Sequence, residues 1–183
     1  MALGVLLAAG MACGSMHRTA FLDEGADFDA IKKVAVLPFE NLTSDQYAAE
    51  KVTRIFIIEL LAAKVVNVVD PGEVARVLHE QGITAVEGVG QEGIASLAKA
   101  MGAQAIILGS VQEFGVDRSS QVSAARVSFT CRMLQAETGN TLWSASVSRG
   151  GAGAMSRLFG VPGDSTTEAA QKMVREALLT LIK

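Results

Sequence analysis

Two stretches in the second half of the chain alternate apolar and polar residues, the pattern of β-strands with one buried face. They cover residues 122–135 and 142–148, and the AETGN segment between them contains a glycine for a turn that needs a positive φ. An apolar run, AIILGSV at 105–111, comes shortly before them. We therefore expect three consecutive strands here, the last two joined as a β-hairpin.

The first half of the chain follows another pattern, in which short apolar runs alternate with helical periodicity. KKVAVLPF at 32–39 and VVNVV at 65–69 predict two strands. Between them, apolar residues recur at the spacing of a helix that runs to about Lys64. Thr43 and Gln46, three residues apart, predict a capping box at the start of this helix.

Three further helices are indicated by their start and stop signals. DPGE at 70–73 predicts the start of one helix, with an N-cap followed by proline. Another short helix, separated from it by a loop, is expected to end at Gly102. Ser165 and Glu168 predict a capping box for the last helix. The resulting order, βαβααβββα, is typical of an α/β (α+β) fold with a mixed β-sheet of about five strands and helices packed on it.

The N-terminal segment is apolar but short. Residues 2–12 give eleven residues before polar ones appear, whereas a membrane-spanning helix needs about 20. The segment resembles a bacterial lipoprotein signal, with Cys13 as the residue that is acylated and becomes the first of the mature protein. We expect 1–13 to be this signal-like segment, possibly with a truncated start, 14–30 to be a tether, and 31–183 to be a single domain. An apolar tail that packs on the domain is the alternative.

Charge and side-chain chemistry exclude several classes of function. The formal net charge of -3 argues against nucleic acid as a partner. Cys131 lies in an alternating strand pattern and is expected to be a core residue, and the histidines, His17 and His79, do not form a pattern with it. We expect no catalytic residues, no metal site and no cofactor.

Two glycine-rich segments invite a nucleotide-binding interpretation. GVGQEG at 88–93 fits G-x-G-x-x-G but has no buried strand before it, so we expect a loop and a helix start. GGAGAMSRLFG at 150–160 has no Lys-Ser/Thr pair. Its apolar residues Met155, Leu158 and Phe159 predict either a partner-docking loop or a loop folded back on the core.

The ordered set of motifs resembles a known family. KKVAVLPFENLT, VVDPGEVARVLHEQG, MGAQAIILGSVQEFG and LQAETGNTLWSASVSRGG are similar to the periplasmic lipoprotein domain of the curli secretion channel CsgG, and to its relatives LpoB and the amino-terminal domain of TolB. The resemblance implies a domain held by lipid at the inner face of the outer membrane that binds other envelope proteins. It carries over only one functional residue, Cys13. A pore is not expected, because the single hairpin is already required by the domain.

These observations lead to one principal hypothesis and two alternatives. We expect a non-enzymatic lipoprotein that acts as an accessory or assembly module of a cell-envelope or secretion machine, with secretion, peptidoglycan or outer-membrane assembly components as partners. The alternatives are a subunit of a homo-oligomeric CsgG-like secretion ring and a small-ligand-binding α/β domain.

Overall fold

A computed structural model describes residues 16–86, 88–117, 124–150 and 164–182. Within these ranges the chain forms a seven-stranded mixed sheet with helices on both faces, so the expected fold class is confirmed. The strands are β1 (Met16–Leu22), β2 (Lys33–Val36), β3 (Glu40–Asn41), β4 (Asn67–Val68), β5 (Ala105–Asp117), β6 (Ala124–Gln135) and β7 (Thr141–Arg149). The helices are η1 (Phe28–Ala30), α1 (Ala48–Ala63), α2 (Pro71–Glu80), α3 (Gln91–Met101) and α5 (Thr166–Leu178).

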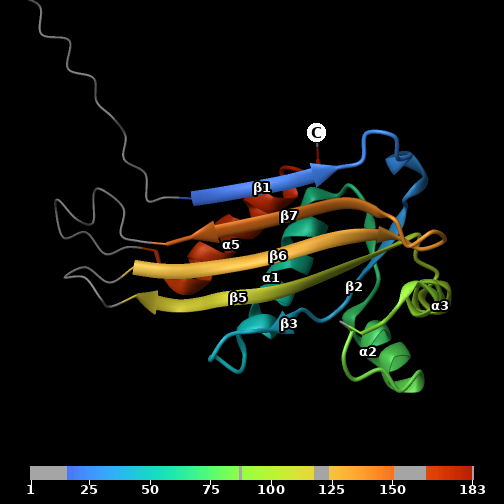
Figure 1. Ribbon diagram of the computed structural model, residues 1–183, viewed down its shortest axis with the longest axis horizontal. Coiled ribbons are helices and arrows are strands. Elements are labelled where there is room, and N and C mark those ends of the chain that lie inside the picture. Colours follow the sequence, from blue (N-terminus) through green and yellow to red (C-terminus); the bar gives the residue numbers. More distant parts are fainter. Residues whose placement is uncertain (1–15, 87, 118–123, 151–163, 183) are drawn as a thin grey trace, which may run out of the picture.

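The sheet has a parallel part and an antiparallel part, in the strand order β1-β7-β6-β5-β2-β4 (Figure 1). Strand β2 pairs in parallel with β4 and β5, as expected for strands connected through helices. Strands β5, β6 and β7 form an antiparallel meander, which includes the predicted hairpin, and β1 pairs antiparallel with the outer edge of β7. At the hairpin turn Gly139 has a φ of 68°, as its place in AETGN predicted.

Two apolar clusters lie on opposite faces of the sheet. The larger cluster joins α1 and α5 to the inner side chains of β2, β5, β6 and β7, with Phe56, Phe129 and Trp143 fully buried. The smaller joins α2 and α3 to the opposite side chains of β2 and β5. The two clusters together explain why the apolar runs at β2 and the start of β5 are continuous instead of alternating.

Strand β1 corrects the expected tether at 14–30. Residues 16–22 pair with β7 along their whole length, from Met16 opposite Arg149 to Leu22 opposite Trp143. An ion pair of 2.9 Å between Arg18 Nη1 and Glu176 Oε2 links the strand to α5. The sequence did not reveal this strand because its side chains are nearly all exposed and carry no alternation of burial, while its stabilisation comes from backbone hydrogen bonds to the free edge of β7.

The predicted helix starts have different outcomes. The capping box of Ser165 and Glu168 is confirmed, and Asp70 caps α2 as expected. The capping box at Thr43 is wrong, because α1 begins only at Ala48. Instead, the hydroxyl of Thr43 contacts Asn41 Oδ1 at 2.9 Å within a polar turn. Local hydrogen bonds of this kind compete with helix formation.

Candidate interaction surface

One face of the antiparallel part of the sheet lacks a helix layer among the described residues. Helix α5 contacts β6 and β7 from the side of the larger cluster, and no described residue of β1 or β7 belongs to the smaller cluster with α2 and α3. The exposed side of β1, β7, β6 and the second half of β5 is called the open face below. Figure 1 shows α1 and α5 together on the opposite side of these strands.

The open face carries a row of four hydroxyl groups that crosses four strands. The register places Thr19 opposite Ser146, Ser146 opposite Thr130, and Thr130 opposite Ser110. Neighbouring strands lie about 4.8 Å apart, so the row is about 15 Å long. At the end of the row formed by β5 and β6, called its inner end, the hydroxyls of Ser110 and Thr130 are 3.0 Å apart.

Gln112 holds the inner end of this row in place. It lies at a register shift between Val111 and Glu113, and its Nε2 donates to Ser110 Oγ at 2.9 Å and to Thr130 Oγ1 at 3.1 Å. An irregularity in an antiparallel pair re-aims a side chain in this way. The hydroxyls are therefore pre-positioned at this end.

A second row on the open face mixes aromatic and charged groups. Phe21, Ser144, Arg132 and Leu108 lie opposite one another on β1, β7, β6 and β5. Phe21 remains 51% exposed. The two rows line a shallow groove of about 490 Å³, which also reaches Glu40 and Val86. A surface of hydroxyl groups with one aromatic, one cationic and one acidic side chain beside it is suited to binding a partner through hydrogen bonds and van der Waals contacts.

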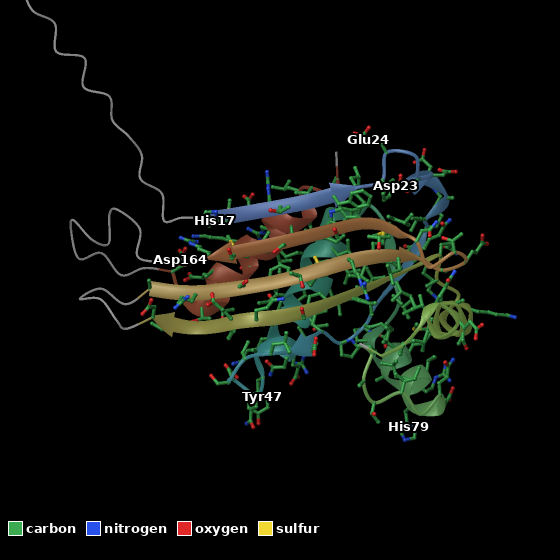
Figure 2. All side chains as sticks on the ribbon, in the orientation of Figure 1. His17, Asp23, Glu24, Tyr47, His79 and Asp164 are labelled. Atoms are coloured by element: carbon green, nitrogen blue, oxygen red, sulfur yellow. The ribbon has the colours of Figure 1, made fainter. Side chains whose placement is uncertain are left out.

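The groups with catalytic potential lie apart from one another. Cys131 is buried on the covered face, where burial raises the pKa of its thiol, so the expectation of a core residue is confirmed. His17 is on β1 and His79 on α2, at opposite sides of the molecule (Figure 2). In the described ranges, no three His, Cys, Asp or Glu side chains come together as a metal site.

The carboxylates with lowered pKa values serve the helix layer. Glu59 on α1 is almost buried and accepts from Arg175 Nε at 2.7 Å and Gln171 Nε2 at 2.6 Å, both on α5. The hydrogen bond from Arg175 is the main cause that lowers the pKa of Glu59. Asp164 likewise has a lowered pKa, with Lys172 as its main cause. These contacts fix α1 and α5 to each other and start the last helix.

The GVGQEG segment is a loop followed by a helix, as expected. Helix α3 begins at Gln91 with Gly90 as its N-cap. The described residues at 81–86 form turns and bends, with no strand before the first glycine. The strand that a dinucleotide-binding turn requires is therefore missing from this part of the described chain.

The residues predicted to serve as anchor and docking loop, Cys13, Met155, Leu158 and Phe159, lie outside the described residues. Among the described helices, none is long and apolar enough to cross a membrane. Sequence reasoning missed the hydroxyl row and the second row beside it. The alternation of serines along β7 indicated which residues share a face, but only the strand register brings residues of four strands into line.

The fold and its surfaces define a small α+β domain. Helices cover both faces of the parallel part of its sheet, whereas the antiparallel part has a helix layer on one side and the open face on the other. The chain belongs to the GNA1162-like family of lipoproteins, whose family model matches residues 28–174. Membership of a lipoprotein family places the protein at the cell envelope. No curated protein matches the chain.

Solved structures share the fold at low sequence identity. The chain is similar to the PelC dodecamer from Paraburkholderia phytofirmans, at 16% identity and a TM-score of 0.62 over 90% of this chain and 95% of that one. It is similar to lipoprotein GNA1162 from Neisseria meningitidis, at 18% identity and a TM-score of 0.59 over 82% and 97%. The LpoB C-terminal domain from Escherichia coli aligns at 15% identity and a TM-score of 0.51 over 70% and 90%.

These findings correct the predicted family. The expectation of a lipoprotein family and the likeness to LpoB are confirmed, the latter at the level of the fold. The assignment to the curli channel family is not supported, because the matching family model is the GNA1162-like one. The motifs misled because strands and helix caps in this order specify a shared fold, and several families can use one fold.

Proposed function

We propose that this protein is a non-enzymatic lipoprotein, anchored through Cys13 at the periplasmic face of the outer membrane, that binds other envelope proteins as an accessory or assembly module. The observation that carries the proposal is the open face, where four strands present aligned hydroxyls beside Phe21 and Arg132. Membership of a lipoprotein family and the LpoB-like fold support it. The partners would be components of secretion, peptidoglycan or outer-membrane assembly.

The open face suits a protein partner for a physical reason. Each hydroxyl both donates and accepts a hydrogen bond, so a partner with peptide groups or polar side chains can replace the water that it displaces. Phe21 and Arg132 belong to residue types that are enriched at protein interfaces, and arginine is also among the types that dominate binding energy there. The side chain of Arg132 is exposed, and Phe21 projects from the edge strand.

Photo-crosslinking in intact cells tests this proposal. A photoreactive amino acid in place of Ser146, at the centre of the hydroxyl row, is expected to capture specific envelope proteins. The same group in place of Arg76, on the exposed side of α2, is the matched control and should capture few or none of them. Equal capture from both positions would argue against the open face as the binding surface.

The lipid anchor has its own test. The Cys13→Ala variant should leave the membrane fraction and appear in the soluble periplasmic fraction. A variant that stays with membranes as strongly as the parent would refute anchoring through Cys13. The mass of the N-terminal peptide of the mature parent protein provides an independent measurement.

Self-assembly into a ring is a second candidate role. It is favoured by the likeness of the fold to the PelC protomer, whose structure is described as a dodecamer. Exposed apolar side chains on the helix layer, including Ile58, Leu61 and Leu179, offer contact area for a second copy. Light scattering of the detergent-extracted lipoprotein should then give one discrete high mass, which Ile58→Asp with Leu61→Asp would lower.

The segment 150–160 remains a proposed docking loop, with Met155, Leu158 and Phe159 as its contact residues. Replacing all three by serine is expected to weaken partner capture without changing the melting temperature. A large fall in melting temperature would instead favour a loop folded back on the core.

A further inference from the structure

Several strand and helix ends meet at one end of the sheet, here called the anchor end. Strand β1 begins there at Met16, opposite Arg149 at the end of β7. Strand β5 finishes and β6 starts at the same end, with Val116 opposite Ala125. The start of α5 joins them, since Thr166 Oγ1 donates to the carbonyl oxygen of Gly115 at 3.4 Å. Figure 1 shows these ends on the left.

The proposed lipid attachment point is covalently close to the anchor end. Cys13 precedes Met16 by three residues. An extended chain spans at most about 3.6 Å per residue, so the two Cα atoms can be no more than about 11 Å apart. The seventeen-residue tether expected for 14–30 would have allowed roughly 60 Å by the same rule. Because β1 is part of the sheet, the chain between Cys13 and the domain is two residues long instead of seventeen.

Strand β1 is fixed to the domain and cannot act as a loose linker. All seven of its residues are paired with β7, and Arg18 forms its ion pair with Glu176 on α5. A short covalent link keeps the start of a paired strand close to the lipid, whereas a long flexible linker does not.

Charge and exposure differ between the two ends of β1. At the anchor end, Met16 and Val116 are 43% and 48% exposed, and the carboxylate of Asp164 is neutralised by Arg149 at 2.7 Å and Lys172 at 2.6 Å. The opposite end continues into an acidic turn with Asp23, Glu24, Asp27 and Asp29. Figure 2 places His17 and Asp164 at one end and Asp23 and Glu24 at the other.

The acidic turn would be repelled by an anionic lipid surface. Asp23 and Asp27 accept hydrogen bonds from backbone N–H groups at Gly25 and Ala30, which leaves their negative charge in place. A seven-residue strand is about 20 Å long, more than twice the Debye length of about 8 Å at physiological ionic strength. The turn escapes this repulsion if β1 rises away from the bilayer.

We propose that the anchor end lies against the lipid headgroups, with the strands rising from the membrane and the acidic turn farthest from it. The inference rests on the proposed acylation of Cys13. In this orientation the open face looks along the plane of the membrane, toward neighbouring proteins held at the same height.

Depth-dependent quenching on vesicles tests the orientation. The lipidated protein carries Val116→Cys at the anchor end or Glu24→Cys at the acidic turn, each labelled with a nitrobenzoxadiazole fluorophore. Acylation blocks Cys13, and Cys131 is buried, so neither competes for the label. The vesicles contain phosphatidylethanolamine, phosphatidylglycerol and a lipid with a nitroxide on its headgroup. His17→Cys is a second anchor-end position, should Val116→Cys fail to fold.

Quenching at position 116 or 17 is expected to exceed quenching at position 24 several-fold. Insertion of twenty Gly/Ser residues between Ser15 and Met16 is the matched control, and it should make quenching at the two ends similar while the protein stays on the vesicles. Equal quenching in the parent protein, or stronger quenching at position 24, would overturn the orientation and leave the anchor intact. Failure of the parent to float with the vesicles would overturn the acylation itself.

Discussion

The covered and open faces of the antiparallel strands are built from alternate residues of the same segments, yet they have opposite chemistry. On β6, Phe129 is fully buried under the helices, while its neighbour Thr130 points to the open face and joins the hydroxyl row. The strand period of two is enough to separate the faces. The comparison teaches that one face holds the domain together, whereas no described helix covers the other.

The helix layer explains the difference in stability between the faces. Phe39, Phe56 and Phe129 pack with ring centroids 5.4 and 6.5 Å apart, and Glu59 joins α1 to α5. The side chains of the open face contact one another through hydrogen bonds and surface ion pairs, such as that of Arg126 with Glu113 at 2.9 Å. Substitutions on the two faces should therefore separate stability from binding.

The largest effect is expected from a matched pair of neighbours on β6. Phe129→Ala should lower the free energy of unfolding by about 3 to 5 kcal/mol, because it leaves a cavity in the larger cluster. Thr130→Ala should lower it by about 1 kcal/mol or less, since it removes hydrogen bonds near the surface. Urea denaturation measures both. Equal losses would contradict the division between the faces.

Breaking the contact between the helices should have the next largest effect. Glu59→Gln is expected to destabilise the domain by about 1 to 2 kcal/mol, because it removes the charge that Arg175 and Gln171 contact. The control is Glu50→Gln, which affects an exposed pair with Arg54 and should change stability by about 0.5 kcal/mol or less. A cost as small for Glu59 as for Glu50 would show that the helices are held by apolar packing alone.

The ion pair between Glu59 and Arg175 predicts that the stability of the domain depends on pH. The pKa of Glu59 is lowered in the folded protein, chiefly by the hydrogen bond from Arg175. Its stabilisation should therefore be complete above the ordinary glutamate pKa of about 4.3 and be lost as the pH falls through the lowered value. The stability difference between the parent and Glu59→Gln should stay constant from neutral pH to about 5 and shrink below about 4. A difference that grows on acidification would contradict this assignment.

The capping box at the start of α5 should contribute less to stability than the contact between the helices. Ser165→Ala removes the hydroxyl that accepts from the backbone N–H of Glu168 and is expected to cost about 1 kcal/mol in thermal unfolding. Thr167→Ala, two residues away and exposed, is the control and should stay within about 0.5 kcal/mol of the parent. No difference between the two variants would mean that α5 is positioned by its apolar face only.

The smallest effect on stability should accompany the largest effect on binding. Ser146→Arg places a long charged side chain at the centre of the open face and is expected to change the free energy of unfolding by about 0.5 kcal/mol or less. It should nevertheless abolish capture of partners from a photoreactive group at Thr19. Undiminished capture would move the binding surface elsewhere on the molecule.

Much of the domain could be predicted locally. The hairpin, the helix capped by Asp70 and the capping box of Ser165 each follow from residues a few positions apart, so their patterns are visible along the chain. Strand β1 was missed because it depends on the free edge of β7, more than a hundred residues away. The cap predicted at Thr43 was wrong because the hydroxyl contacts Asn41 in a turn.

The sequence by itself determined which residues are apolar on each strand, where most helices start and stop, and that Cys13 follows a short apolar segment. Only the tertiary structure decided that four hydroxyls align across four strands and that the strand nearest Cys13 is paired and not loose. The physical reason is that periodicity and capping act over a few residues, whereas register and edge pairing depend on backbone groups brought together by the whole fold.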